Sequence, residues 1–195
     1  MTFRVLFICT GNICRSPSAE RLLTSALAHH RSSGEVLVGS AGTKPVLDAA
    51  IEPQAAQLLS AAGADVAGFS ARRLTPSLLD EADLVLGLAR EHRSSAAQMW
   101  PSALRRSFTL REFARLVSRI TTAELAAVVG DGAPLPDRLR AIAELAPLHR
   151  APVAHPDLDD VPDPYGREAE AFEAAHVQIV RAVEAIGAAL ELSHA

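Results

Sequence analysis

The chain has 195 residues, of which 49% are hydrophobic and 22% are charged, and its formal net charge is −4. This balance is typical of a folded globular protein and excludes a disordered chain, and the length suits one domain with one core. A slightly acidic chain gives no reason to expect nucleic acid or an anionic membrane as a partner.

The number and spacing of the cysteines, together with the first residues of the chain, indicate the cellular compartment. The two cysteines, Cys9 and Cys14, lie five positions apart and cannot form a disulfide framework. A strand pattern begins directly after Met1, with no basic stretch ahead of an apolar one, and no apolar run approaches membrane-spanning length. We therefore expect a cytoplasmic protein without membrane association.

The predicted elements alternate between strands and helices along the chain. Strands are predicted over residues 3–8, 35–40, 82–88 and 106–110, and the second of these ends in residues 41–43. Helices are predicted over residues 17–30, 52–63, 90–99 and 166–192. Strands separated by helices predict an α/β fold, with one parallel sheet covered by helices on both faces. Ligands bind such sheets beyond the carboxyl ends of the strands, which is where Cys9 stands.

Residues 121–156 interrupt this alternation. A turn-rich stretch over 130–136 precedes a short predicted helix over 137–146, and prolines follow at positions 147, 152 and 156. We interpret the segment as a helix–loop insertion in a single domain that spans residues 1–195. A lid, a dimer contact and a passive insertion are all compatible with the sequence.

The segment after the first strand places a thiol among groups that bind oxyanions. Residues 9–16, here called the oxyanion loop, read Cys-Thr-Gly-Asn-Ile-Cys-Arg-Ser. Gly11 and Asn12 tolerate the left-handed backbone that a tight loop needs. Ser16-Pro17 predicts a helix cap followed by the first helical residue. Backbone N–H groups, a helix N-terminus and Arg15 then form a cradle for a tetrahedral oxyanion around the sulfur of Cys9.

The chemistry of this cradle requires a thiolate and a fixed cation. An ordinary cysteine has a pKa of about 8.5, and a helix N-terminus together with a cation lowers it by several units. The planar fork of Arg15 can hold two phosphoryl oxygens and compensate the charge that spreads over them. A buried structural cysteine and a surface arginine are the plainer interpretation, and the combined loop argues against it.

Asp163 is the candidate general acid, in a segment that reads Val161-Pro162-Asp163-Pro164-Tyr165-Gly166 and is here called the acid loop. A departing aryl oxygen needs a proton, which a carboxylic acid can supply. The flanking prolines stiffen the segment, and Tyr165 is placed to flank an aromatic substrate. From spacing alone a plain Asp-Pro turn is equally open, because other carboxylates precede it at positions 157, 159 and 160.

Together these motifs resemble the low-molecular-weight protein tyrosine phosphatases of the bacterial type. The resemblance covers residues 9–20, 40–43, 82–86 and 161–166, in the family's order. It implies a four-stranded parallel sheet and a hydrolase that acts on phosphotyrosine in a protein substrate through a phosphocysteine intermediate. Inorganic phosphate is the expected product, and no metal or other cofactor is expected.

The resemblance also implies residue roles. Cys9 would be the nucleophile, Arg15 the phosphate clamp and Asp163 the general acid. The phosphate would be bound by the oxyanion loop, that is by Thr10, Gly11, Asn12, Ile13, Cys14, Arg15 and Ser16. Ser40 would help to hold the loop and the thiolate, and Tyr165 would flank the substrate.

Two positions leave questions open. The family often has a histidine where this chain has Phe69, so that histidine's hydrogen bond to the loop is missing or replaced. Cys14 either pairs with Cys9 on oxidation or is a small residue needed for packing the loop.

Three alternatives concern the activity. An arsenate reductase on the same loop needs further cysteines, and none follows Cys14. Protein arginine phosphatases tend to carry threonine where this chain has Ile13, whose bulk favours phosphotyrosine. A non-catalytic oxyanion-binding domain is the third alternative, and the joint presence of Cys9, Arg15 and Asp163 argues against it.

Overall fold

A parallel sheet of four strands forms the centre of the computed structural model, which describes residues 2–28, 35–130, 132–151 and 153–191. The strand order is β2-β1-β3-β4. Their bounds are β1 (Phe3–Cys9), β2 (Val36–Gly42), β3 (Leu84–Gly87) and β4 (Ser107–Thr109). The expected fold class is thereby confirmed.

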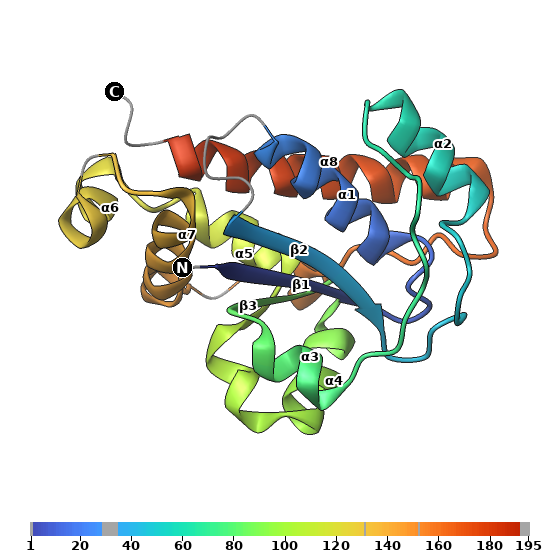
Figure 1. Ribbon diagram of the computed structural model, residues 1–195, viewed down its shortest axis with the longest axis horizontal. Helices are drawn as coiled ribbons and strands as arrows, with labels where there is room; N and C mark the ends of the chain where they lie inside the picture. Colours follow the sequence, from blue (N-terminus) through green and yellow to red (C-terminus); the bar gives the residue numbers. More distant parts are fainter. Residues whose placement is uncertain (1, 29–34, 131, 152, 192–195) are drawn as a thin grey trace.

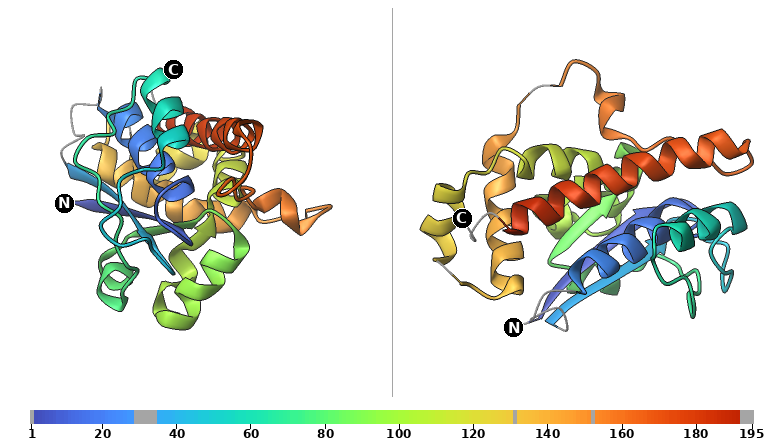
Figure 2. Two further views of the ribbon diagram at one scale, coloured as in Figure 1. Left: turned by 90° about the vertical axis from the view of Figure 1, so that its right-hand side faces the viewer. Right: turned by 90° about the horizontal axis from the view of Figure 1, so that it is seen from above.

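Helices cover both faces of this sheet, as Figures 1 and 2 show. Successive side chains of a strand point to opposite faces, so Val5 and Phe7 of β1 join the core under α1, α5 and α8, whereas Leu6 and Ile8 join the core under α3 and α4. The helices are α1 (Arg15–Leu27), α2 (Pro53–Ala61), α3 (Pro76–Glu81), α4 (Arg90–Met99), α5 (Leu110–Val117), α6 (Thr122–Val129), α7 (Leu135–Leu145) and α8 (Ala169–Glu191). Short 3₁₀ helices are η2 (Pro101–Arg106), η3 (Ala146–His149) and η4 (Pro156–Asp159).

The first helix begins earlier than the sequence predicts. Helix α1 starts at Arg15 with Cys14 as N-cap residue, and no side chain caps it. Ser16 and Pro17 are therefore its second and third residues rather than its cap and first residue. The hydroxyl of Ser16 contacts the sulfur of Cys9 instead, and a proline is tolerated here because the first backbone N–H groups of a helix have no partner within it.

Other predicted elements differ mainly at their ends. Strand β2 begins at Val36 rather than at residue 35, and it ends at Gly42, within the predicted end at residues 41–43, because its pairing with β1 continues to the pair Cys9–Gly42. Leu110, predicted to end a strand, begins α5, since Thr109 and Glu112 form a capping box. The predicted helix over 137–146 starts at Leu135. Residues 29–30 and 192 of the predicted helices, and Asp131 and Pro152 of the predicted insertion, lie outside the described residues.

Three short helices, α3, α5 and α6, are absent from the prediction. Thr75 caps α3, and Thr121 forms a capping box with Glu124 at the start of α6. Both capping signals can be recognised in the sequence. Helices of six to eight residues are, however, too short to show a clear periodicity of apolar residues.

The segment 121–156 contributes to the main core. Leu125 of α6 and Leu139 and Ile142 of α7 are fully buried in the same cluster as α1, α5 and α8. That this segment is an insertion remains a prediction. No helix among the described residues is long and apolar enough to cross a membrane.

Candidate active site

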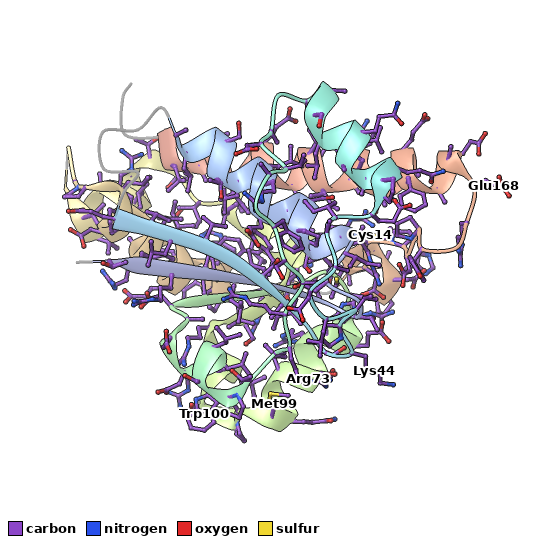
Figure 3. All side chains as sticks on the ribbon, turned by 45° about the vertical axis from the view of Figure 1, so that its right-hand side comes forward. Cys14, Lys44, Arg73, Met99, Trp100 and Glu168 are labelled. Carbon is purple, nitrogen blue, oxygen red and sulfur yellow. The ribbon has the colours of Figure 1, made fainter. Side chains whose placement is uncertain are left out.

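The oxyanion loop begins where β1 ends, at the carboxyl edge of the sheet. The backbone of a neighbouring segment, residues 43–52, donates hydrogen bonds to the carbonyl oxygens of this loop. Thr43 N–H donates to the Cys9 oxygen and Lys44 N–H to the Thr10 oxygen, each over 3.0 Å. Val46 N–H likewise donates to the Gly11 oxygen. Figure 3 shows Cys14 and Lys44 at this same end of the molecule.

The sulfur of Cys9 lies inside this loop and accepts two hydrogen bonds. Asn12 adopts a left-handed backbone with φ of 53°, and its N–H donates to Cys9 Sγ over 3.2 Å. Ser16 Oγ lies 2.9 Å from the same sulfur. Because the Asn12 side-chain amide donates to Ser16 Oγ over 2.9 Å, the proton of the Ser16 hydroxyl is left for the sulfur. The loop therefore directs two hydrogen-bond donors at the Cys9 sulfur.

Asn12 holds the loop through a buried hydrogen-bond network. Its side-chain amide also donates to Ser40 Oγ over 2.8 Å, and the Ser40 hydroxyl donates to Glu20 Oε2 over 2.6 Å. Its carbonyl oxygen accepts the backbone N–H of Arg72 over 2.9 Å. Burial raises the pKa of Glu20, and the hydrogen bond from Ser40 opposes that rise. The structure thus brings Asn12, Ser16 and Ser40 together around Cys9.

Phe69 makes no polar contribution at the position of the family's histidine. It packs against the apolar cluster that includes Ile13 and Ala55, and the guanidinium of Arg21 lies 5.6 Å from its ring centroid. Within the described residues, the Arg72 N–H is the donor that satisfies the Asn12 carbonyl. Sequence reasoning missed this contact, because a backbone amide leaves no signal in residue type.

Arg15 connects the oxyanion loop with the acid loop. Its side chain is 4% exposed, with Nη1 donating to the Val161 carbonyl over 3.0 Å and Nη2 lying 2.8 Å from Asp163 Oδ2. The carboxylate of Asp163 is half exposed, and its other oxygen accepts the Tyr165 N–H over 3.3 Å. Tyr165 itself is 62% exposed. Arg15 and Asp163, 148 residues apart, therefore meet in one ion pair.

Two of the neighbouring carboxylates, Asp159 and Asp160, pair with arginines other than Arg15. Asp160 accepts the Arg90 backbone N–H over 2.7 Å and binds its guanidinium, which lowers the pKa of Asp160 against the opposing effect of burial. Asp159 pairs with Arg115 of α5 over 3.1 Å. These contacts fix the chain just before the acid loop and leave Asp163 as the carboxylate at Arg15.

The second cysteine of the loop, Cys14, is a buried thiol. Burial raises its pKa to about 12, and the charges of Glu52, Cys9 and Asp163 add to the effect. Its thiol therefore stays protonated at neutral pH. Both cysteines are free. Pairing with an oxidised Cys9 would require Cys14 to lose this proton, and its redox role remains a prediction.

His92 is a second residue that sequence reasoning missed. It is fully buried on α4, and its Nε2 lies 3.0 Å from Thr10 Oγ1. Its position in the predicted helix did not indicate a functional role, since a lone histidine on a helix face is usually a packing residue.

Comparison with known proteins agrees with this geometry. A parallel sheet with a thiol-centred oxyanion loop at its carboxyl edge is the arrangement of a phosphatase. The family model described as low molecular weight phosphotyrosine protein phosphatase matches residues 4–125. The chain belongs to this family of metal-independent hydrolases, which confirms the resemblance.

Individual relatives include two kinds of phosphatase. The low molecular weight protein-tyrosine-phosphatase Wzb of Salmonella typhi is 26% identical over 182 residues, which are 91% of this chain and 87% of the relative. A protein-arginine-phosphatase of Geobacillus stearothermophilus is 33% identical over 113 residues, which are 58% of this chain and 72% of the relative.

Solved structures show the same fold. Vibrio vulnificus Wzb in complex with benzylphosphonate has a TM-score of 0.66 at 22% identity and covers 96% of this chain and 99% of its own. The YwlE arginine phosphatase of Geobacillus stearothermophilus has a TM-score of 0.66 at 23% identity and covers 99% and 97%.

Proposed function

We propose that this protein tyrosine phosphatase hydrolyses phosphotyrosine in protein substrates in the cytoplasm, with Cys9 as nucleophile and Asp163 as general acid. The observation that carries the proposal is the position of Arg15. Arg15 belongs to the loop that surrounds the Cys9 sulfur, and its guanidinium binds the Asp163 carboxylate over 2.8 Å, so one residue links the loop of the nucleophile to the acid. Cys9 must be a free thiol, which a reducing cytoplasm maintains.

Substrate binding changes the environment of Asp163. A phosphoryl dianion in the oxyanion loop places negative oxygens next to the Arg15 guanidinium, where Asp163 Oδ2 now lies. The dianion therefore competes for the cation and repels the ionised carboxylate. The proposed role of Asp163 requires its protonated form, which is the form that can donate a proton.

In the first step, the Cys9 thiolate attacks phosphorus in line with the scissile bond. The sulfur–phosphorus bond forms as the bond from phosphorus to the tyrosyl oxygen breaks. That oxygen keeps the bonding electron pair and takes the proton of Asp163, so the product leaves as a phenol. Arg15 and the loop N–H groups hold the charge on the three remaining oxygens.

In the second step, water hydrolyses the phosphocysteine. The Asp163 carboxylate takes a proton from the water, whose oxygen attacks phosphorus, and the phosphorus–sulfur bond breaks. Cys9 leaves as a thiolate that accepts hydrogen bonds from Ser16 and the Asn12 N–H. Inorganic phosphate is released and Asp163 is again protonated.

Arginine phosphatases among the relatives make phosphoarginine the second candidate substrate. In this chain Ile13 is 8% exposed and packs with Ile51 and Ala55, so the loop carries a bulky apolar side chain at the position where threonine is expected in an arginine phosphatase. The acid loop also presents the exposed ring of Tyr165. These features favour a flat aromatic substrate.

The test compares turnover of a phosphotyrosine peptide and a phosphoarginine peptide of equal sequence by the wild type and by Cys9→Ser. We expect a higher kcat/KM for phosphotyrosine, and no turnover of either peptide by Cys9→Ser. Calorimetry should show that Cys9→Ser still binds inorganic phosphate. Turnover by Cys9→Ser would contradict the mechanism. A higher kcat/KM for phosphoarginine would identify phosphoarginine, and not phosphotyrosine, as the substrate.

A further inference from the structure

His92 connects helix α4 to the oxyanion loop, and the mechanism above does not use it. It is the third residue of α4, and its side chain is 1% exposed. Its Nε2 lies 3.0 Å from the hydroxyl oxygen of Thr10, which directly follows the nucleophile Cys9 in the chain.

We propose that His92 is a positioning residue for phosphoryl transfer. Its neutral imidazole donates a hydrogen bond to Thr10 and thereby fixes the second residue of the oxyanion loop beside Cys9. This inference rests on the proposed function, because it assigns His92 to the same reaction at the same site.

The sheet brings His92 to the loop. Strands β1 and β3 pair in parallel with Ile8 opposite Gly87, and the Leu88 N–H donates to the Ile8 oxygen over 2.8 Å. Helix α4 starts directly after β3, so its first turn lies at the same edge as the loop. A Cβ atom on Gly87 would lie 2.8 Å from the Arg93 nitrogen and 3.2 Å from His92 Cβ. Glycine at this position therefore permits the close approach of α4.

The hydrogen-bond partners of the imidazole assign its tautomer. Nδ1 is buried and has no hydrogen-bond partner among the described residues. Nε2 has two oxygen atoms nearby, Thr10 Oγ1 at 3.0 Å and Glu91 Oε1 at 3.4 Å. A proton on Nδ1 would be a buried donor without an acceptor, so the proton resides on Nε2 and is donated to Thr10. The Thr10 hydroxyl then keeps its own proton for another acceptor, such as a phosphoryl oxygen in the loop.

The surroundings keep this imidazole uncharged. Burial and the positive charge of Arg15 together lower the pKa of His92 to about 4, against the opposing effects of Asp163 and Asp160. Glu91, on the same helix, is mostly exposed. A second proton would stand on Nδ1 without a partner. His92 is therefore a fixed donor over the working pH range and does not compete with Asp163 as an acid.

The test uses four variants of the full chain and one control. His92→Leu removes the donor, Thr10→Val removes the acceptor and keeps the shape, and a third variant combines both changes. His92→Gln retains a side-chain N–H donor. The control is His149→Leu, which removes a histidine that pairs with Glu124 of α6 over 3.2 Å, away from the loop. The readouts are kcat and KM for para-nitrophenyl phosphate and the inhibition constant of inorganic phosphate.

We expect His92→Leu and Thr10→Val each to lower kcat/KM about tenfold or more and to raise the phosphate inhibition constant, since small misplacements of reacting groups are costly. The combined variant should lose little more than either single one, because both remove the same contact. His92→Gln should retain most of the activity and His149→Leu all of it.

Wild-type kcat/KM and phosphate inhibition in His92→Leu would overturn the proposal, and so would losses that multiply in the combined variant. If His92→Leu does not fold, Thr10→Val decides, and wild-type values for that variant overturn the proposal. These outcomes leave the proposed function intact. A wild-type protein that neither hydrolyses aryl phosphate nor binds phosphate would instead contradict the proposed function, and this inference with it.

Discussion

Arg15 and Asp163 form an ion pair of 2.8 Å that joins the start of the first helix to the acid loop near the other end of the chain. The guanidinium is buried, whereas the carboxylate is half exposed. In the absence of substrate the clamp and the acid therefore neutralise each other. In the proposed mechanism, a bound dianion competes for this guanidinium, and Asp163 protonates the departing oxygen.

Asp163→Asn should slow the hydrolysis of poor leaving groups most. We expect kcat for phenyl phosphate to fall by about 10²–10⁴-fold, because no proton reaches the phenolate, and kcat for para-nitrophenyl phosphate to fall less. Steady-state kinetics with a series of aryl phosphates measures this dependence. Asp157→Asn, which changes a nearby carboxylate in η4, should keep the wild-type dependence. An unchanged leaving-group dependence in Asp163→Asn would assign the acid to another residue.

Arg15→Lys should lose most activity even though the charge is retained. An ammonium group cannot hold two phosphoryl oxygens in a planar fork, nor bind the Val161 carbonyl and Asp163 together. We expect kcat/KM for para-nitrophenyl phosphate to fall about 10²–10³-fold and phosphate inhibition to weaken. Arg167→Lys, at an exposed arginine just after the acid loop, serves as the matched control. Equal activity of the two variants would show that Arg15 acts as a charge alone.

The two cysteines should differ in their reaction with iodoacetate. Cys14 has a pKa of about 12 because it is buried, so only about one thiol in 10⁵ is ionised at pH 7. We expect mass spectrometry to find carboxymethylation at Cys9, with protection by inorganic phosphate, and none at Cys14 in the folded protein. Modification of both residues at similar rates would refute this distinction.

Acid should destabilise the wild type more than His92→Gln. The pKa of His92 is lowered from 6.5 to about 4 in the folded protein by burial and by Arg15, against Asp163 and Asp160. The unfolded chain therefore binds a proton here at a pH where the folded protein does not, and stability is lost as the pH falls from 6.5 towards 4. This loss amounts to about 2–3 kcal/mol.

Urea unfolding at about pH 7.5 and about pH 4.5 measures this effect. Subtracting the change in His92→Gln removes the contributions of the carboxylates and of His176, which both proteins share. An equal loss of stability in both proteins would show that His92 does not cause the difference.

The sequence predicts the fold because its main strands are strongly apolar and its longer helices have clear periods. Residues 3–8 lack alternation, as expected of a strand buried on both faces, and β1 proves to be such a strand. Short helices have too few residues to show a clear periodicity of apolar residues. The starts of α3, α5 and α6 are determined by their N-cap residues instead. The predicted start of α1 is wrong because the Ser16 hydroxyl contacts the Cys9 sulfur and does not cap the helix.

The candidate site is predictable where side-chain type determines the chemistry. A thiol, a guanidinium and a carboxylate are visible as Cys9, Arg15 and Asp163. The supporting contacts are less visible, since the Arg72 N–H that binds Asn12 is a backbone group. His92 lies 82 positions from Thr10, and only the pairing of β1 with β3 brings the two together.

The most direct test of the central claim locates the phosphoryl group during turnover. Wild-type protein is mixed with para-nitrophenyl phosphate and quenched rapidly, and the peptide with both cysteines is fragmented in a mass spectrometer. The mechanism predicts phosphate on the sulfur of Cys9, and neither phosphorylation nor turnover in Cys9→Ser. Phosphate on another residue, or turnover that persists without the Cys9 sulfur, would contradict it.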